Sequence, residues 1–588
     1  MNRFDLRAVL ILASLFSIVF TTTISRNSKA DTSSKAAVSG FDLTNLDKSC
    51  KPCEDFFQYA SGGWIANNPI PAAFPRWGNF QKLAEKNVEV LRQILEEKSK
   101  EKGLKKGTNE QKISDLYCSC MDTEKIEADT VNPLLPELKE IDAIKDKEGL
   151  QTQIAKLHTY GIAVVFRTGG SQDLKDVTKY IAFVDQSGIG LPDRDYYFNS
   201  DEKSKKIRDE YTKHVAKMFE LLGDKAESAE IAAKTVMSIE SKLAEGSMTR
   251  TERRNPDARY NKMSLAKLQE LAPNVSWNAY FATIGLKSVD GVNVVDPNFF
   301  KTVNKLVEEV SLSDWKTYLK WHLVNAAAPS LSSKFVDQDF YFKETVIKGT
   351  KENLPRWRRC VAATDRMLGE ALGQFYVERS FTPEAKTRAL EMVKNLRQAL
   401  RVSINNLDWM SEPTRKEALA KLDLLVNKIG YPDKWRDYSA LEIDRSSYFR
   451  NLIRGANFSF KENLAKIGKP VDKSEWFMSP PTVNAYYSAT MSEIVFPAGI
   501  LQPPFFNPAA DDAVNYGGIG AVIGHELTHG FDDQGRKFDF QGNLKDWWTP
   551  EDEKNYKERA DCVEKQFSNF VVDGDLHING KLVLGESI

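Results

Sequence analysis

Most of the chain carries the hydrophobic pattern of α-helices. Between about residues 56 and 435, apolar residues recur at spacings of three and four, most clearly at 83–97 and 414–428. This period places apolar side chains along one face of a helix. Gly430 and Pro432 follow the second segment and predict where that helix stops.

The pattern changes after about residue 473. Pro480 and Pro481 mark a break, and residues 483–487 and 493–496 then read as short strands. A glycine-rich stretch at 516–520 leads into a further helix. We therefore expect a largely helical region over residues 49–472 and a domain that carries the chemistry over residues 473–588.

The N-terminus has the pattern of a signal peptide. Arg3 and Arg7 precede an apolar run at residues 8–20, and Ser28-Lys29-Ala30 offers a cleavage site. We expect residues 1–30 to be removed on export to the periplasm or the extracellular space, and 31–48 to form a linker. An uncleaved anchor is the alternative, but the apolar run is short for a membrane span. No stable span is expected after cleavage.

Composition narrows the class of protein. The chain has 588 residues, of which 41% are hydrophobic and 28% charged, as in a soluble globular protein with more than one domain. Its formal net charge is -1, which argues against a dedicated nucleic-acid binder, because such proteins carry a basic excess.

The spacing of the cysteines favours disulfides, which form in an oxidising compartment, over metal binding. The spacing of Cys118 and Cys120 is poor for zinc, and no matching histidine pair lies nearby. Export would favour disulfides instead. We therefore expect dispersed disulfides among the six cysteines: Cys50, Cys53, Cys118, Cys120, Cys360 and Cys562.

The strongest chemical signal is His525-Glu526-Leu527-Thr528-His529. Histidines four residues apart lie on one face of a helix, so both imidazoles can reach one zinc ion. Glu526 lies beside the metal without binding it, and can take a proton from the zinc-bound water and pass it to the leaving amine. The pattern predicts zinc-dependent hydrolysis.

A third zinc ligand has two candidates. No histidine follows His529 at the spacing of the metzincins, which disfavours that class. Glu586 would complete a two-histidine, one-glutamate site of the thermolysin type. His577 competes with it, but the sequence His577-Ile578-Asn579-Gly580 favours a surface turn.

The chain resembles the neprilysin and endothelin-converting-enzyme family of zinc metalloendopeptidases. The resemblance rests on Asn484-Ala485-Tyr486-Tyr487, on the zinc motif with Gly530-Phe531-Asp532-Asp533, and on further matches at 494–506, 516–520, 546–548, 52–57, 62–64, 191–197 and 428–432. It implies a mainly α fold with a small β-sheet, in which a large helical domain and a thermolysin-like α+β zinc peptidase domain enclose a cavity. It also implies a bacterial-type secreted member.

The same resemblance implies roles for individual residues. It makes His525, His529 and Glu586 the ligands of one zinc ion per chain, and Glu526 the general base. The substrate would be a short peptide, cut at the amino side of a hydrophobic residue. Its contacts would be the edge-strand pair Asn484 and Ala485, the apolar pocket of Phe80, Ile500, Phe505 and Val522, and Arg76 at the far end.

Departures from the family pattern concern the C-terminus. In the family, the helix with the third ligand continues with Ala-Asp, and that aspartate orients a zinc histidine. A histidine that stabilises the tetrahedral intermediate and an arginine near the substrate follow later. All would lie beyond Ile588, so we expect a C-terminally truncated chain with weakened zinc binding and little or no peptidase activity.

The resemblance also implies a cysteine pairing. Ser61 stands where the family has a cysteine, and Cys120 pairs with Cys360. Cys53 and Cys562 would stay free, because their family partners lie past the end. A bridge between Cys50 and Cys118 is left open.

Two other functions remain open at this stage. A catalytically dead zinc-binding or peptide-binding module would share the metal motif, although it would not need Glu526 as a base. A metallo-aminopeptidase would also share the motif, but the sequence shows no anionic pocket for a free amine.

Overall fold

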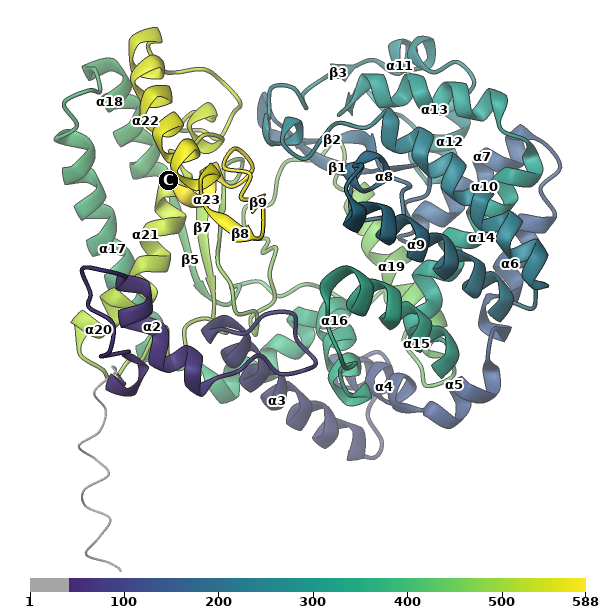
Figure 1. Cartoon of the computed structure of the whole chain (residues 1–588), viewed down its shortest axis with the longest axis horizontal. Coiled ribbons are helices and arrows are strands. Elements are labelled where there is room, and N and C mark those ends of the chain that lie inside the picture. Colours follow the sequence, from purple (N-terminus) through teal and green to yellow (C-terminus); the bar gives the residue numbers. More distant parts are fainter. Residues whose placement is uncertain (1–41) are drawn as a thin grey trace, which may run out of the picture.

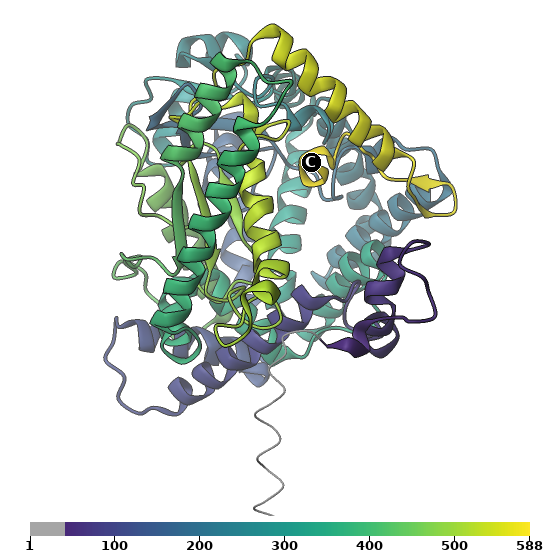
Figure 2. The ribbon, with the colours of Figure 1, turned by 90° about the vertical axis from the view of Figure 1, so that its left-hand side faces the viewer.

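The computed structural model describes residues 42–588 and has two lobes (Figure 1). The predicted signal peptide, and the predicted linker up to residue 41, lie outside the described residues. We call residues 123–347 together with α19 (Tyr448–Leu464) the helical lobe. Residues 42–121, 356–443 and 484–588, which include the His-Glu-x-x-His sequence, form the motif lobe. Figure 2, turned by 90°, shows the long helices of the motif lobe from the side.

Long amphipathic helices dominate the helical lobe, as the spacing of apolar residues predicts. A four-stranded sheet of order β1-β2-β4-β3 lies among them. Its elements are α5 (Thr123–Asp129), α6 (Leu135–Asp142), α7 (Lys147–Thr159), β1 (Phe166–Asp173), β2 (Asp176–Gln186), α8 (Asp195–Phe198), α9 (Glu202–Leu221), α10 (Ala226–Glu245), η4 (Glu252–Arg254), β3 (Lys262–Met263), α11 (Leu265–Leu271), α12 (Trp277–Thr283), β4 (Val292–Val294), α13 (Pro297–Glu309), α14 (Leu312–Ala327), α15 (Ser333–Phe340) and α19 (Tyr448–Leu464).

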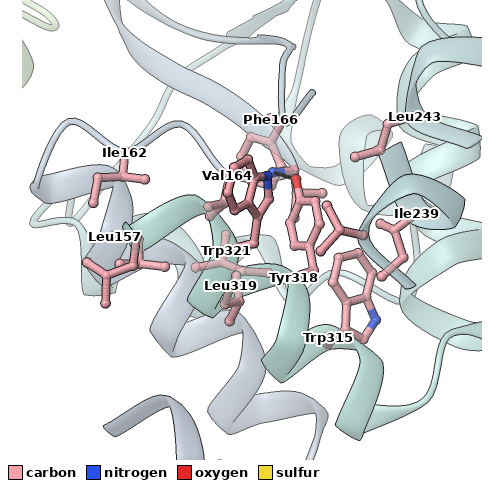
Figure 3. Packing of buried hydrophobic residues seen from close by; sticks show 14 of the residues in the cluster. Leu157, Ile162, Val164, Phe166, Ile239, Leu243, Trp315, Tyr318, Leu319 and Trp321 are labelled. Carbon is pink, nitrogen blue, oxygen red and sulfur yellow. Dashed lines mark hydrogen bonds between the residues drawn. The ribbon is translucent and has the colours of Figure 1, made fainter. Parts of the chain in front are cut away.

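Large aromatic side chains fill the core of this lobe, and Figure 3 shows part of the cluster around Phe166 and Tyr318. One carboxylate, Glu240, is buried among them. It accepts hydrogen bonds from the hydroxyls of Tyr197 (2.7 Å) and Tyr211 (2.8 Å). A buried charge is tolerated only when it is hydrogen-bonded in this way, so Glu240 fixes how α8, α9 and α10 meet.

The motif lobe has its own core and a three-stranded sheet of order β5-β7-β6. β7 is buried throughout and runs parallel to β5 and antiparallel to β6. The elements are α2 (Phe56–Asn67), α3 (Asn79–Lys100), α4 (Asn109–Met121), α16 (Arg356–Ser380), α17 (Pro383–Asn405), α18 (Glu412–Leu424), β5 (Val426–Gly430), β6 (Tyr486–Ser488), β7 (Glu493–Pro497), α20 (Asp512–Gly517), α21 (Ile519–His529), η7 (Gly535–Lys537), α22 (Pro550–Ser568), β8 (Val571–Asp573), β9 (Leu576–His577) and α23 (Leu584–Ser587).

The predicted fold class, mainly helical with a small sheet beside the zinc motif, is confirmed. One element differs from expectation. The helix predicted over 414–428 ends at Leu424, and residues 426–430 form β5 instead. Val426 and Ile429 pair with β7, because strand pairing across the core outweighs local helical spacing there.

The domain division at residue 473 and the enclosed cavity stay predictions. β5 precedes this boundary in the sequence and β7 follows it, yet the two strands pair in space. Among the described residues, no helix is both long and apolar enough to cross a membrane.

A disulfide joins Cys120 of α4 to Cys360 of α16, which confirms that pairing. Both residues are buried in the core of the motif lobe. Cys50, Cys53, Cys118 and Cys562 are all free, so the bridge between Cys50 and Cys118 that was left open does not form.

Removing the disulfide should lower stability markedly. The bridge closes a loop over a sequence separation of 240 residues. Restricting the unfolded chain in this way stabilises the folded state by about 5 kcal/mol at most. We expect the double variant C120A/C360A to unfold at clearly lower urea concentration than the oxidised wild type. The free thiol Cys118, on the same helix, supplies the control C118A, and equal midpoints for all three proteins would contradict the prediction.

Candidate active site

The zinc motif lies on α21, which has one buried and one accessible face. Ile519, Ile523 and Leu527 recur every four residues and are buried in the core of the motif lobe. His525 and His529 follow the same spacing on a partly accessible face. The apolar stripe therefore fixes the rotation of the helix and, with it, the direction of both imidazoles.

Three potential metal ligands converge at this face. The Nε2 atoms of His525 and His529 are 3.0 Å apart, and Oε2 of Glu586 lies 3.4 Å from the first and 3.8 Å from the second. Tetrahedral ligands at about 2.0–2.1 Å from a zinc ion would be roughly 3.4 Å apart. The donor set and its spacing therefore fit zinc. α23 presents Glu586, whose side chain is otherwise largely exposed.

Asp532, to which the sequence pattern assigned no role of its own, contacts the second histidine. Its Oδ2 lies 2.8 Å from Nδ1 of His529. Because a carboxylate only accepts hydrogen bonds, Nδ1 carries the proton and Nε2 keeps its lone pair for a metal. Asp532 also raises the pKa of His529 through this hydrogen bond. Its position three residues after a ligand, just beyond the helix, was the available signal.

The loop that holds Asp532 is itself anchored. The other carboxylate oxygen, Oδ1, accepts from the backbone N–H groups of Gln534 (2.9 Å) and Gly535 (2.6 Å). Lys421 of α18 is buried beneath the loop and donates to the carbonyls of Gly535 (2.6 Å) and Phe538 (2.7 Å). Burial lowers the pKa of Lys421 to about 7. The carboxylate beside His529 is therefore rigidly placed.

Glu526 is only 5% exposed, although it directly follows the partly accessible His525 in the sequence. Burial and, to a smaller extent, the charge of Glu586 raise the pKa of Glu526 to about 7, while His529 and the backbone N–H of Tyr487 act in the opposite direction. A carboxyl group with a raised pKa can both accept and release a proton near neutrality. The role of Glu526 as the base stays a prediction.

The predicted edge-strand pair lies at an edge of the sheet. Asn484 is exposed and Ala485 is buried, directly before β6. β6 is an outer strand in the order β5-β7-β6, and α21 packs against it. Among the described residues, neither Asn484 nor Ala485 makes a backbone hydrogen bond.

The predicted pocket residues divide into two groups. The rings of Phe80 and Phe505 lie 4.5 Å apart, and Phe80 is 40% exposed. The carbonyl of Phe505 accepts from the N–H of Ile519, so Phe505 lies at the start of α21, and Val522 lies one turn further along. Ile500, in contrast, is fully buried in the core.

Arg76 and His577 are not part of the three-residue group that could bind a metal. Arg76 is exposed, four residues before Phe80, and makes no ion pair within residues 42–588. His577 is exposed in β9, with Nδ1 3.0 Å from the carbonyl of Ser568. Its surroundings are those of a surface turn.

The fold and this site together define a zinc metallopeptidase. Two models of peptidase family M13 match the chain, one over residues 52–432 and one over residues 484–588. The chain belongs to peptidase family M13, whose members are metalloendopeptidases, and the predicted resemblance is thereby confirmed.

Relatives agree with this assignment. The chain is 36% identical to endothelin-converting enzyme 1 of Rattus norvegicus, over 93% of this chain and 73% of that protein. It is 33% identical to neprilysin-3 of Drosophila melanogaster, over 93% and 72%. The zinc metalloprotease Zmp1 of Mycobacterium tuberculosis, in complex with an inhibitor, is 40% identical with a TM-score of 0.89, over 93% of this chain and 84% of that one. Its open state, over 91% and 84%, gives a TM-score of 0.73.

Replacing Asp532 by asparagine should weaken zinc binding. An amide keeps the size of the side chain but loses the charge that fixes the proton on Nδ1 of His529. Losing such a partner typically costs about 10–100-fold in metal affinity. Competition with a chromogenic chelator measures this. D561N, at an exposed position on α22, is the control, and unchanged zinc affinity in D532N would remove Asp532 from this role.

Proposed function

We propose that this chain is a zinc-dependent endopeptidase that hydrolyses short peptides at the amino side of hydrophobic residues. Family membership supports the metallopeptidase class. The observation that carries the proposal is the buried carboxyl group of Glu526. In the sequence it lies between His525 and His529, whose ligand atoms lie within 4.8 Å of each other and of Glu586. A protein that only bound zinc would have no use for a buried base at that position.

In this proposal Glu526 transfers a proton from the attacking water to the leaving amine. When bound, zinc supplies positive charge that acidifies a water molecule and polarises the scissile carbonyl. Glu526 accepts a proton from the attacking water at its carboxylate and then donates it to the leaving amine nitrogen. His529 keeps its orientation through Asp532, and so holds its Nε2 toward the metal position throughout.

The substrate backbone would pair with the edge of the sheet. An extended peptide adds readily to an outer strand whose N–H and C=O groups lack partners. Asn484 and Ala485 have such groups and precede β6, against which the zinc helix packs. A peptide bound there would run past Glu526.

Side-chain preference would come from the apolar surface at the start of α21. Phe80 and Phe505 contact each other there, and Val522 lies on the next turn. A hydrophobic side chain that follows the cut would be removed from water against these three residues. Ile500 would support the surface from behind, because it is fully buried. Arg76 is exposed, makes no ion pair with another described residue, and would contact the far carboxylate of a short peptide.

The proposed location is outside the cytoplasm. The buried bridge between Cys120 and Cys360 supports it, because such disulfides persist in oxidising compartments. The pattern at residues 1–30 supports export by an N-terminal signal. Sequencing the N-terminus of the secreted or periplasmic protein would test this, and a chain recovered only from the cytoplasm would contradict it.

Glu526→Gln should separate catalysis from metal binding. The amide cannot accept the proton, so we expect cleavage of a quenched fluorescent peptide to fall by about 10²–10⁴-fold. Zinc content, measured by equilibrium dialysis, should stay near that of the wild type. The control H525A should lose zinc itself, since it removes a ligand. Peptidase activity retained by E526Q would rule out the role of Glu526 as base.

Phe505→Ala should change specificity more than general activity. Removing one ring opens the proposed pocket, so kcat/KM for peptides with Phe or Leu after the cut should fall by about 10-fold or more. Peptides with Ala at that position should be much less affected. F57A is a matched control, because Phe57 is exposed on α2. Equal losses for both kinds of peptide would contradict a pocket at Phe505.

A further inference from the structure

The helical lobe contacts the loop that follows the zinc helix. Nη2 of Arg254, at the end of η4, lies 2.8 Å and 3.0 Å from the two carboxylate oxygens of Asp533. When the side-chain amide of Gln534 is oriented so that both its nitrogen and its oxygen have partners, the nitrogen donates to the carbonyl of Arg254 (2.9 Å). The oxygen then accepts from Nη2 of Arg254 (3.0 Å). Nζ of Lys537 donates to Asn255 (2.6 Å) and to Asp257 (2.7 Å). Two short polar segments from different lobes are thus held together.

This contact lies directly behind the metal-binding groups. Asp533 follows Asp532, which orients His529, and Gly585 precedes Glu586. A Cβ atom on Gly585 would lie 2.8 Å from Oδ2 of Asp532, 3.0 Å from Nη2 of Arg254 and 3.0 Å from Oδ1 of Asp533. Four groups from three segments therefore meet at one point, and a residue larger than glycine would force these side chains to shift.

Charge explains why an arginine from the other lobe is needed there. Asp532 and Asp533 bring two carboxyl groups to this point, Glu586 follows Gly585 directly in the sequence, and Lys421 contacts the loop only from the side of the motif lobe. The Arg254 and Asp533 side chains are 18% and 22% exposed, so solvent screens their charges less than on an open surface. If the lobes separate, the loop and the segment around Gly585 lose this cation.

We propose that Arg254 is a positioning residue for the metal site. The helical lobe brings Arg254 to the site when the two lobes close. Closure would fix the loop of Asp532 and the backbone at Gly585 together, and so set the distance between His529 and Glu586. The inference rests on the proposed zinc site. Because coupling between two equilibria is reciprocal, zinc must then favour closure by the same factor by which closure strengthens zinc binding.

The alternative is an ordinary ion pair between lobes. Such a pair would contribute little to stability and nothing to metal affinity. The two cases differ in zinc binding and in the response of the lobes to zinc, and both can be measured without a peptidase assay.

The test compares R254M with the wild type by chelator competition. Methionine keeps an apolar stem but removes the charge, and we expect zinc affinity to fall by about 5-fold or more. R254K should recover part of the loss, since lysine restores the charge without the planar fork. R250M is the matched control. Arg250 lies four residues earlier, is exposed, and pairs within its own lobe with Asp193, so its loss should change nothing.

Small-angle scattering supplies the second readout. Zinc should reduce the radius of gyration of the wild type, and R254M should be more extended and respond less. D533N removes the same pair from the other side, so it keeps the test decisive if R254M folds poorly. Zinc affinity and scattering like those of the wild type, in whichever of these two variants folds, would overturn the proposal. A wild type that binds no zinc would instead refute the proposed function.

Discussion

One helix has to satisfy two demands in this protein, and the rest of the site depends on how it does so. α21 must bury Ile519, Ile523 and Leu527 in the core of the motif lobe, and it must direct His525 and His529 toward a common point. Both sets repeat every four residues, so they lie on separate faces of the same helix. Burial of the apolar face therefore determines where the two imidazoles point.

Residues around α21 orient the two histidines so that they can bind a metal ion. Asp532 fixes the tautomer of His529, and Lys421 anchors the loop that carries Asp532 from beneath. Burying a lysine is costly unless its donors are satisfied, and here two backbone carbonyls satisfy them. Polar groups that look structural thus contribute to the geometry of the ligands.

The contacts within the motif lobe differ in kind from the contacts between the two lobes. Within the motif lobe, the disulfide between Cys120 and Cys360 ties helices that are distant in sequence. Between the lobes, the contacts behind the site are hydrogen bonds and ion pairs such as that of Arg254 with Asp533. Covalent and apolar contacts favour a fixed lobe, whereas polar contacts between lobes can break and reform as the lobes move.

The sequence alone determined the class of site, because the spacing of His525, Glu526 and His529 encodes chemistry within one helical turn. It also identified the helical character of most of the chain. Only the tertiary structure decided that residues 426–430 form a strand, that Asp532 contacts His529, and that Arg254 reaches Asp533. The physical reason is range: local periodicity reports which face of an element is apolar, whereas strand partners and contacts between lobes depend on which segments pack together in space.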